Sequence, residues 1–190
     1  MGQDYVLGLD SGTTACKVII VDREGNVIGE ATQPHEPFFS RQPNWAEQKP
    51  SVWWAKFCRA AKDALRKANV PSRKLVALGI TTQRSTIVPL DEQGNELRPA
   101  ICWIDTRSLP RYEWIKDNEP EIRKKIYKLL DVQGWFIYKL TGEWKDSRAS
   151  TFLNVSRETW DWDERLVDQG ELPEDMLPEF HLPGEVLGYV

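Results

Sequence analysis

The sequence predicts an α/β fold in which a mixed β-sheet is flanked by helices, and two observations support this. Short apolar runs separated by tight turns open the chain, and an amphipathic helical pattern followed by another apolar run comes next. The chain of 190 residues is 41% hydrophobic and 11% aromatic, which is enough to bury one sizeable core. We therefore expect residues 1–190 to form one folded domain.

The first three predicted strands are joined by short polar turns. Residues 5–9 and 16–21 flank the turn at 10–14, and a second turn at 22–26 leads into residues 27–32. Consecutive strands joined by tight turns pair antiparallel. The sequence therefore predicts an opening three-strand antiparallel meander.

Residues 50–69 carry apolar side chains three and four positions apart, which is typical of a helix with one buried face. The expected face consists of Trp54, Phe57, Cys58, Ala61 and Leu65. Residues 75–81 follow as a strand, as the crossover to a parallel neighbour requires. This order of three strands, a helix and a strand also opens the actin-like ATPase and ribonuclease-H-like fold.

The sequence of the second half of the chain predicts a β-hairpin followed by helices. Residues 87–90 and 100–104 flank a turn and are expected to form the hairpin. Apolar spacing predicts one long helix within residues 119–140, with Gly142 as its stop. Two short helices are expected near residues 163–169 and 174–177.

Composition and charge argue against several kinds of partner. The net charge of −4, with both signs spread along the chain, provides no basic field for nucleic acid. No apolar stretch approaches the ~20 residues that span a bilayer, so we expect no membrane partner and a cytoplasmic location. The odd, widely spaced cysteines Cys16, Cys58 and Cys102 predict buried thiols rather than disulfides or a zinc site.

The turn at residues 10–14 is the candidate nucleotide site. Small residues between two strands leave backbone N–H groups uncovered, and such a nest can hold phosphate oxygens. The candidate contacts are Asp10 for Mg²⁺ and, for the phosphates, Gly12, Thr13, Thr14 and Lys17. The same residues also make an ordinary hairpin turn, because Gly and Asp favour turns for conformational reasons.

Ordered motifs along the chain resemble the FGGY carbohydrate kinase family, which includes glycerol kinases and xylulokinases. They are YVLGLDSGTT at 5–14, WAEQKP at 45–50, GITTQRST at 79–86, ICWIDTR at 101–107, YKLTG at 138–142 and MLP at 176–178. The resemblance implies the amino-terminal actin-like domain of a kinase that uses ATP and Mg²⁺. The implied reaction transfers the γ-phosphoryl group to a hydroxyl of a small sugar or polyol.

The resemblance also implies substrate residues. Arg84 and Trp103 occupy the positions at which glycerol kinase grips polyol hydroxyls and packs the carbon face, roles that suit a guanidinium fork and an indole. Ser85 stands where glycerol kinase has an acidic partner, which favours another substrate, such as a pentulose or hexulose. Gln83 and Asp105 complete the predicted substrate site.

Two departures from the family bear on activity. The segment near residues 108–112 is shorter than in the family, which removes an aromatic residue expected to close over the substrate. The family's catalytic base lies in a segment that would follow Val190, and the adenine site belongs to a second, carboxy-terminal domain. We therefore assign no catalytic residue and expect the chain alone to be inactive, with that domain as its partner. Apolar surface left uncovered without it would favour a homo-oligomer.

Two other functions remain open. The same fold suits a non-catalytic sugar-binding or assembly domain. It also suits a nucleotide-driven conformational protein of the actin type, against which Arg84 and Trp103 argue.

Overall fold

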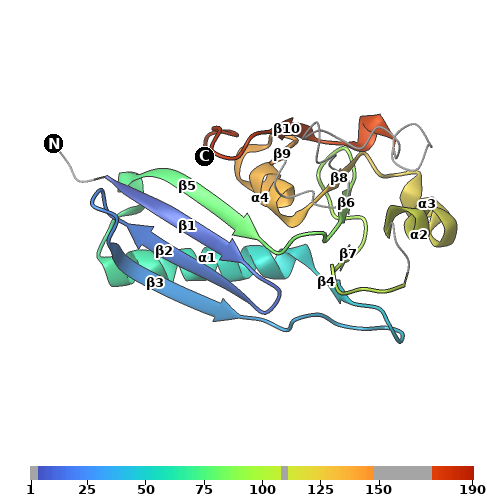
Figure 1. The fold of residues 1–190 in the computed structure, drawn as a ribbon, viewed down its shortest axis with the longest axis horizontal. Helices are drawn as coiled ribbons and strands as arrows, with labels where there is room; N and C mark the ends of the chain where they lie inside the picture. Colours follow the sequence, from blue (N-terminus) through green and yellow to red (C-terminus); the bar gives the residue numbers. More distant parts are fainter. Residues whose placement is uncertain (1–3, 108–110, 148–172) are drawn as a thin grey trace. The chain divides into compact units, whose positions relative to one another are not determined.

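The computed structural model describes residues 4–107, 111–147 and 173–190 (Figure 1). The chain divides into two compact units. The first contains Met1–Pro37 and Ser51–Gln83, and the second contains Phe38–Pro50 and Arg84–Val190. None of the helices within the described ranges combines the length and apolar character needed to cross a membrane.

A four-stranded sheet with the order β3-β2-β1-β5 forms the first unit. Its strands are β1 (Tyr5–Ser11), β2 (Ala15–Val21), β3 (Val27–Pro34) and β5 (Leu75–Thr82). β1 pairs antiparallel with β2 and parallel with β5, and β2 pairs antiparallel with β3. The predicted meander and the predicted parallel strand are both confirmed.

The helix α1 (Pro50–Ala68) packs against this sheet, and the short 3₁₀ helix η1 (Ser72–Lys74) leads into β5. Burial alternates along β1, so that Leu7 and Leu9 are both within the core. The helix packs closely against Gly29 of β3, where an added Cβ would lie 2.6 Å from the carbonyl oxygen of Ala64. The absence of a side chain at position 29 therefore permits the close packing.

The buried face of α1 is displaced by one position from the predicted face. The side chains in the core, none more than 6% exposed, are Trp53, Phe57, Ala60 and Ala64. Three of the predicted face residues after Trp54 lie half-buried beside them: Cys58, Ala61 and Leu65. The prediction was right for Phe57 and wrong by one position elsewhere, because the close approach at Gly29 turns the side of the helix that carries Ala64 and Ala68 toward β3.

The described residues of the second unit form three short strand pairings and three α-helices. β4 (Glu47–Gln48) pairs antiparallel with β7 (Ala100–Ile101), β6 (Val88–Leu90) antiparallel with β8 (Lys128–Leu130), and β9 (Lys145–Ser147) parallel with β10 (Glu179–His181). The helices are α2 (Arg111–Asn118), α3 (Pro120–Arg123) and α4 (Val132–Thr141). Their shared core includes Ile101, Tyr112, Ile115, Ile126, Leu129 and Met176.

The predicted hairpin of residues 87–90 and 100–104 forms only in part. Single bridges join Ile87 to Ile101 and Leu90 to Glu96, but β6 and β7 pair with other strands. β7 ends at Ile101, because the chain then turns, with the N–H of Asp105 donating to Cys102 O at 3.0 Å.

The prediction of one helix over residues 119–140 was wrong. α3 ends at Arg123, and residues 128–130 form β8, which buries Leu129 and Leu130 against β6. α4 then begins after its N-cap, Asp131. The apolar spacing fits both one long helix and a strand between two helices. The pairing of β8 with β6 and the cap at Asp131 decide in favour of the second arrangement.

The end of α4 and the 3₁₀ helix that follows it in the described residues agree with the sequence predictions. α4 ends at Thr141, and the predicted stop Gly142 is its C-cap, with a φ of 78° in the left-handed region. Residues 174–176 form the 3₁₀ helix η2 (Glu174–Met176), close to the predicted range. The helix predicted at 163–169 lies outside the described residues.

The close contact at Gly29 generates a stability prediction. Gly29→Ala should lower the free energy of unfolding by ~1–3 kcal/mol, because its Cβ would overlap α1. Gly79→Ala is the matched control in the same sheet, since nothing lies within 4 Å of its added Cβ. Urea denaturation compares the two variants, and equal stabilities would contradict this account of the packing.

Candidate functional site

The β1–β2 connection is the turn predicted to contact phosphate. The Gly12 N–H donates to Ala15 O at 2.9 Å, which leaves Thr13 and Thr14 as the two-residue loop. Thr14 is exposed, and its carbonyl oxygen accepts from the N–H of His35 at 2.9 Å. The threonines therefore lie on a turn that main-chain hydrogen bonds hold in place.

Gln83, predicted as a substrate residue, lies against this turn. Its N–H donates to Ser11 O at 2.9 Å, and its Oε1 accepts from Thr13 Oγ1 at 3.1 Å. Gln83 is only 8% exposed. Parallel strands bring their carboxyl ends to one edge of a sheet, which is where β1 and β5 place these residues. The observed contacts of Gln83 hold the turn.

Asp10 and Lys17 are cross-strand neighbours on the exposed side of β1 and β2. Lys17 Nζ lies 3.0 Å from Glu30 Oε2, and both side chains are about half exposed. The hydrogen bond from Lys17 and then its charge lower the pKa of Glu30. The predicted phosphate cation therefore has an internal partner, but the pair is a surface ion pair of the weak kind.

The acidic group of Asp10 suits Mg²⁺ as a single protein ligand. Within residues 4–107, 111–147 and 173–190, no group of three or more histidine, cysteine and acidic side chains is placed to hold a metal ion. Mg²⁺ commonly keeps several waters and binds one or two carboxylates together with substrate phosphates. An exposed carboxylate beside a candidate phosphate turn fits that chemistry.

Residues 84–86 form a strained turn at the start of the second unit. Ser85 has a φ of 57°, in the left-handed region that costs a non-glycine residue ~1–2 kcal/mol. Its N–H donates to Asp131 Oδ2 at 3.1 Å. The buried Thr86 hydroxyl donates to Arg84 O at 3.5 Å, and the Arg84 side chain is exposed. Backbone strain of this kind is frequent at functional sites.

Trp103 is joined to this turn through Thr86. The N–H of Trp103 donates to Thr86 Oγ1 at 3.2 Å. On the other side, Arg111 donates through Nη2 to Trp103 O at 2.6 Å and through Nε to Cys102 O at 3.0 Å. The main chain of Trp103 is thus fixed, whereas the residue is 51% exposed. The structure brings together the segments that carry Arg84 and Trp103.

Asp131 supports this arrangement, although the sequence motifs did not single it out. Asp131 is 6% exposed, and its Oδ1 accepts from the Val132 N–H at 2.6 Å, which caps α4. Burial and then the neighbouring Asp146 raise the pKa of Asp131 well above its ordinary range. An aspartate directly before an apolar helical run is a known N-cap signal, so the sequence did contain the clue.

Asp105, predicted as a substrate residue, is instead part of a buried ion-pair network. It is 2% exposed, and its Oδ2 accepts from Arg107 Nη2 at 2.7 Å and the Ala46 N–H at 2.6 Å. Arg107 also donates to Glu47 Oε1 at 2.9 Å, an oxygen that Arg98 shares. Burial alone would raise the pKa of Asp105, but these hydrogen bonds and the charge of Arg107 lower it. In this structure the carboxylate is used within the protein rather than presented to a ligand.

Comparison with known proteins identifies relatives of the whole chain. The model of the amino-terminal domain of the FGGY family of carbohydrate kinases matches residues 5–113 and 107–190. Glycerol kinase from Thermococcus gammatolerans is 33% identical over 221 residues, covering 97% of this chain and 44% of that protein. Similar folds occur in gluconate kinase from Lactobacillus acidophilus, with a TM-score of 0.87 at 19% identity over 98% of this chain and 43% of that chain. Xylulose kinase from Rhodospirillum rubrum has a TM-score of 0.87 at 24% sequence identity, and the match covers 98% of this chain and 45% of that chain.

The matches also describe how this chain differs from its relatives. The chain spans less than half the length of each of these proteins. The match to the Thermococcus protein is 221 residues long, although the chain has 190. The two segments matched by the family overlap at residues 107–113. Both features agree with a shorter segment near residues 108–112, which stays a prediction.

The raised pKa of Asp131 generates a prediction for stability against pH. An acid with a raised folded-state pKa stabilises the fold fully below its unfolded pKa of ~3.9, and this contribution is lost as pH rises toward the folded pKa. Asp131→Asn removes this titration. The free energy of unfolding of the wild type minus that of the variant should therefore fall as pH rises above about 4.

Urea denaturation across this pH range measures that difference. Asp117→Asn, at an exposed position on α2, is the matched control and should give a flat difference. A wild-type advantage over Asp131→Asn that grows with pH would contradict the direction of the shift.

Proposed function

The chain belongs to the FGGY family of carbohydrate kinases, and from this we propose that it is the amino-terminal half of an ATP-dependent kinase. The proposed reaction transfers the γ-phosphoryl group to a hydroxyl of a small sugar or polyol. The observation that carries the proposal is the joining of Arg84 and Trp103 through the Thr86 hydroxyl, with both side chains exposed.

Arg84 and Trp103 have complementary chemistry for such a substrate. A guanidinium offers a planar fork of donors for neighbouring hydroxyls. An exposed indole offers an apolar face for the carbon side of the same molecule. Because Thr86 and Arg111 fix the main chain around both residues, little ordering is needed when a substrate binds.

The turn at residues 12–15 supplies the proposed nucleotide contacts. Bound Mg-ATP would provide the phosphoryl group, with the metal neutralising charge on its phosphates. Asp10 would offer one carboxylate to the metal, directly or through water, and the Thr13 and Thr14 hydroxyls would face phosphate oxygens. Lys17 would exchange its exposed partner Glu30 for a phosphate.

Ser85 bears on which substrate is accepted. A serine hydroxyl cannot supply the two charged acceptor oxygens of a carboxylate. We therefore propose a substrate other than glycerol, such as a pentulose or hexulose. The relatives named glycerol, gluconate and xylulose kinases show that the family includes different substrates.

We further propose that the isolated chain does not turn over. It matches 44% of the Thermococcus glycerol kinase, and we place the general base and the adenine site in the other part of such an enzyme. General-base assistance contributes ~100- to 10,000-fold to rate. The partner of this chain would then be the carboxy-terminal domain.

Binding to the 190-residue chain tests the proposal in two parts. Saturation-transfer NMR with glycerol, xylitol, D-xylulose and gluconate should detect at least one ligand, and Arg84→Ala should weaken it ~10-fold or more. Calorimetry with Mg-ATP should detect weak binding that Asp10→Asn reduces. Arg73→Ala, at another exposed arginine, is the control for both ligands.

Specific results would contradict the substrate assignment and the inactivity of the isolated chain. Equal sugar binding by Arg84→Ala and Arg73→Ala would remove the substrate assignment. Robust phosphoryl transfer by this chain alone would contradict the proposed location of the base.

A further inference from the structure

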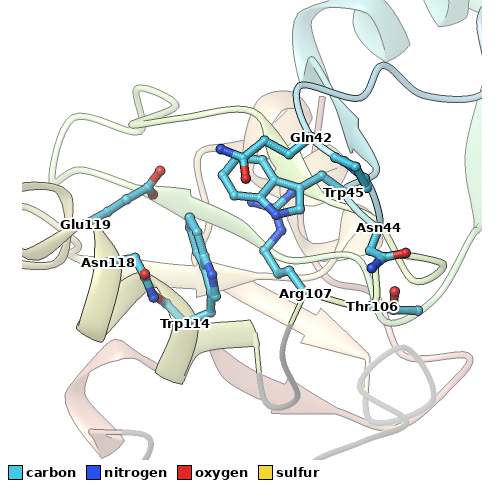
Figure 2. A pocket seen from close by; sticks show the side chains of 9 residues that line it. Gln42, Asn44, Trp45, Thr106, Arg107, Trp114, Asn118 and Glu119 are labelled. Atoms are coloured by element: carbon cyan, nitrogen blue, oxygen red, sulfur yellow. The ribbon is translucent and has the colours of Figure 1, made fainter.

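A second binding site is suggested by a pocket of about 580 Å³ in the second unit (Figure 2). Its walls include the indoles of Trp45 and Trp114, and polar side chains of Gln42, Asn44, Thr106 and Asn118 surround them. Arg84, Ser85 and Trp103 are not among its lining residues. The pocket is therefore built from residues other than those of the proposed substrate site, and its volume suits a small molecule.

The two indoles are held rigidly. Their ring centroids lie 5.1 Å apart at an interplanar angle of 81°. The guanidinium carbon of Arg107 lies 3.9 Å from the Trp45 ring centroid and 4.7 Å from that of Trp114. Figure 2 shows Arg107 beside both rings, with Asn118 and Glu119 at one end of the pocket and Thr106 at the other. The aromatic surface is thus formed before any ligand arrives.

The charged residues of the pocket are neutralised within the protein. Arg107, whose side chain is 1% exposed, is paired with Asp105 and Glu47. Glu119 accepts from Arg98 at 2.9 Å. The pocket therefore offers no unpaired charge of the kind that would select a phosphate or a cation. What remains is three amides, one hydroxyl and two indoles, and of the amides that of Asn118 already donates through Nδ2 to Trp114 O at 2.9 Å.

These uncharged polar groups and indole rings are suited to binding a neutral carbohydrate. The C–H face of a sugar ring packs on an indole, and amide groups both donate to and accept from hydroxyls. We propose that this pocket binds a neutral pyranose-containing mono- or disaccharide, as a site separate from the one formed by Arg84 and Trp103.

The pocket also lies beside the interruption of the family match. The two matched segments overlap at residues 107–113, and the lining residues Arg107 and Trp114 lie at the start of this overlap and directly after it.

An NMR titration of the full chain tests the site, with methyl β-D-glucopyranoside and maltose as probes and adenosine as the counter-probe. The indole N–H signals of Trp45 and Trp114 should shift and saturate with at least one sugar. Absence of a saturable shift at both indoles with both sugars, shifts confined to Trp103, or a stronger saturable response to adenosine would overturn the proposal.

Variants separate this site from the proposed kinase site. Gln42→Ala removes an exposed amide and should weaken sugar binding about two- to tenfold, the effect of one neutral hydrogen bond. Gln93→Ala makes the same change at the exposed turn after β6 and should have no effect. Arg84→Ala should leave binding in this pocket intact, so either site can fail without the other. Equal affinities of Gln42→Ala and Gln93→Ala would count against the pocket.

Discussion

A single buried carboxyl group, that of Asp131, links two segments on which the candidate sugar site depends. It caps α4 through the Val132 N–H and also accepts the N–H of Ser85. A buried donor left without a partner costs ~1–3 kcal/mol, so neither the helix nor the turn can easily leave this anchor. Arg84 is consequently an exposed cation on a fixed main chain, an arrangement that lowers the entropy cost of holding a ligand.

The buried ions of the second unit serve a comparable purpose for the aromatic surface. Arg107 is in contact with Asp105, Glu47 and the ring of Trp45 at once. Removing one member of a buried ion pair costs ~3–5 kcal/mol, because the other charge is left uncompensated. The network therefore fixes the segments around residues 45–47 and 105–107 relative to each other. It explains why Asp105, although part of a recognisable motif, is 2% exposed.

Local signals were sufficient to predict the strands and the helix of the first unit, although not the buried face of that helix, and they were insufficient for the second unit. In the turn at residues 22–26, an aspartate side chain accepts hydrogen bonds from two main-chain N–H groups, and a glycine has a φ of 88°. Both residue types are typical of turns, so the sequence alone predicts this one. The apolar spacing of residues 119–140, in contrast, fits both a helix and a strand flanked by helices. Only the pairing of β8 with β6 decides between them. The candidate site divides in the same way: motifs identified Arg84 and Trp103, but the roles of Thr86 and Asp131 depend on contacts between distant segments.

The left-handed backbone of Ser85 limits how this position can change during evolution. Asparagine, aspartate and glycine adopt that conformation readily, whereas valine, isoleucine and threonine are strongly disfavoured because their branched Cβ clashes with the main chain. Substitutions at this position are therefore restricted to a short list of small or polar side chains. The backbone of the turn thus limits which side chains can stand next to Arg84, whatever molecule binds there.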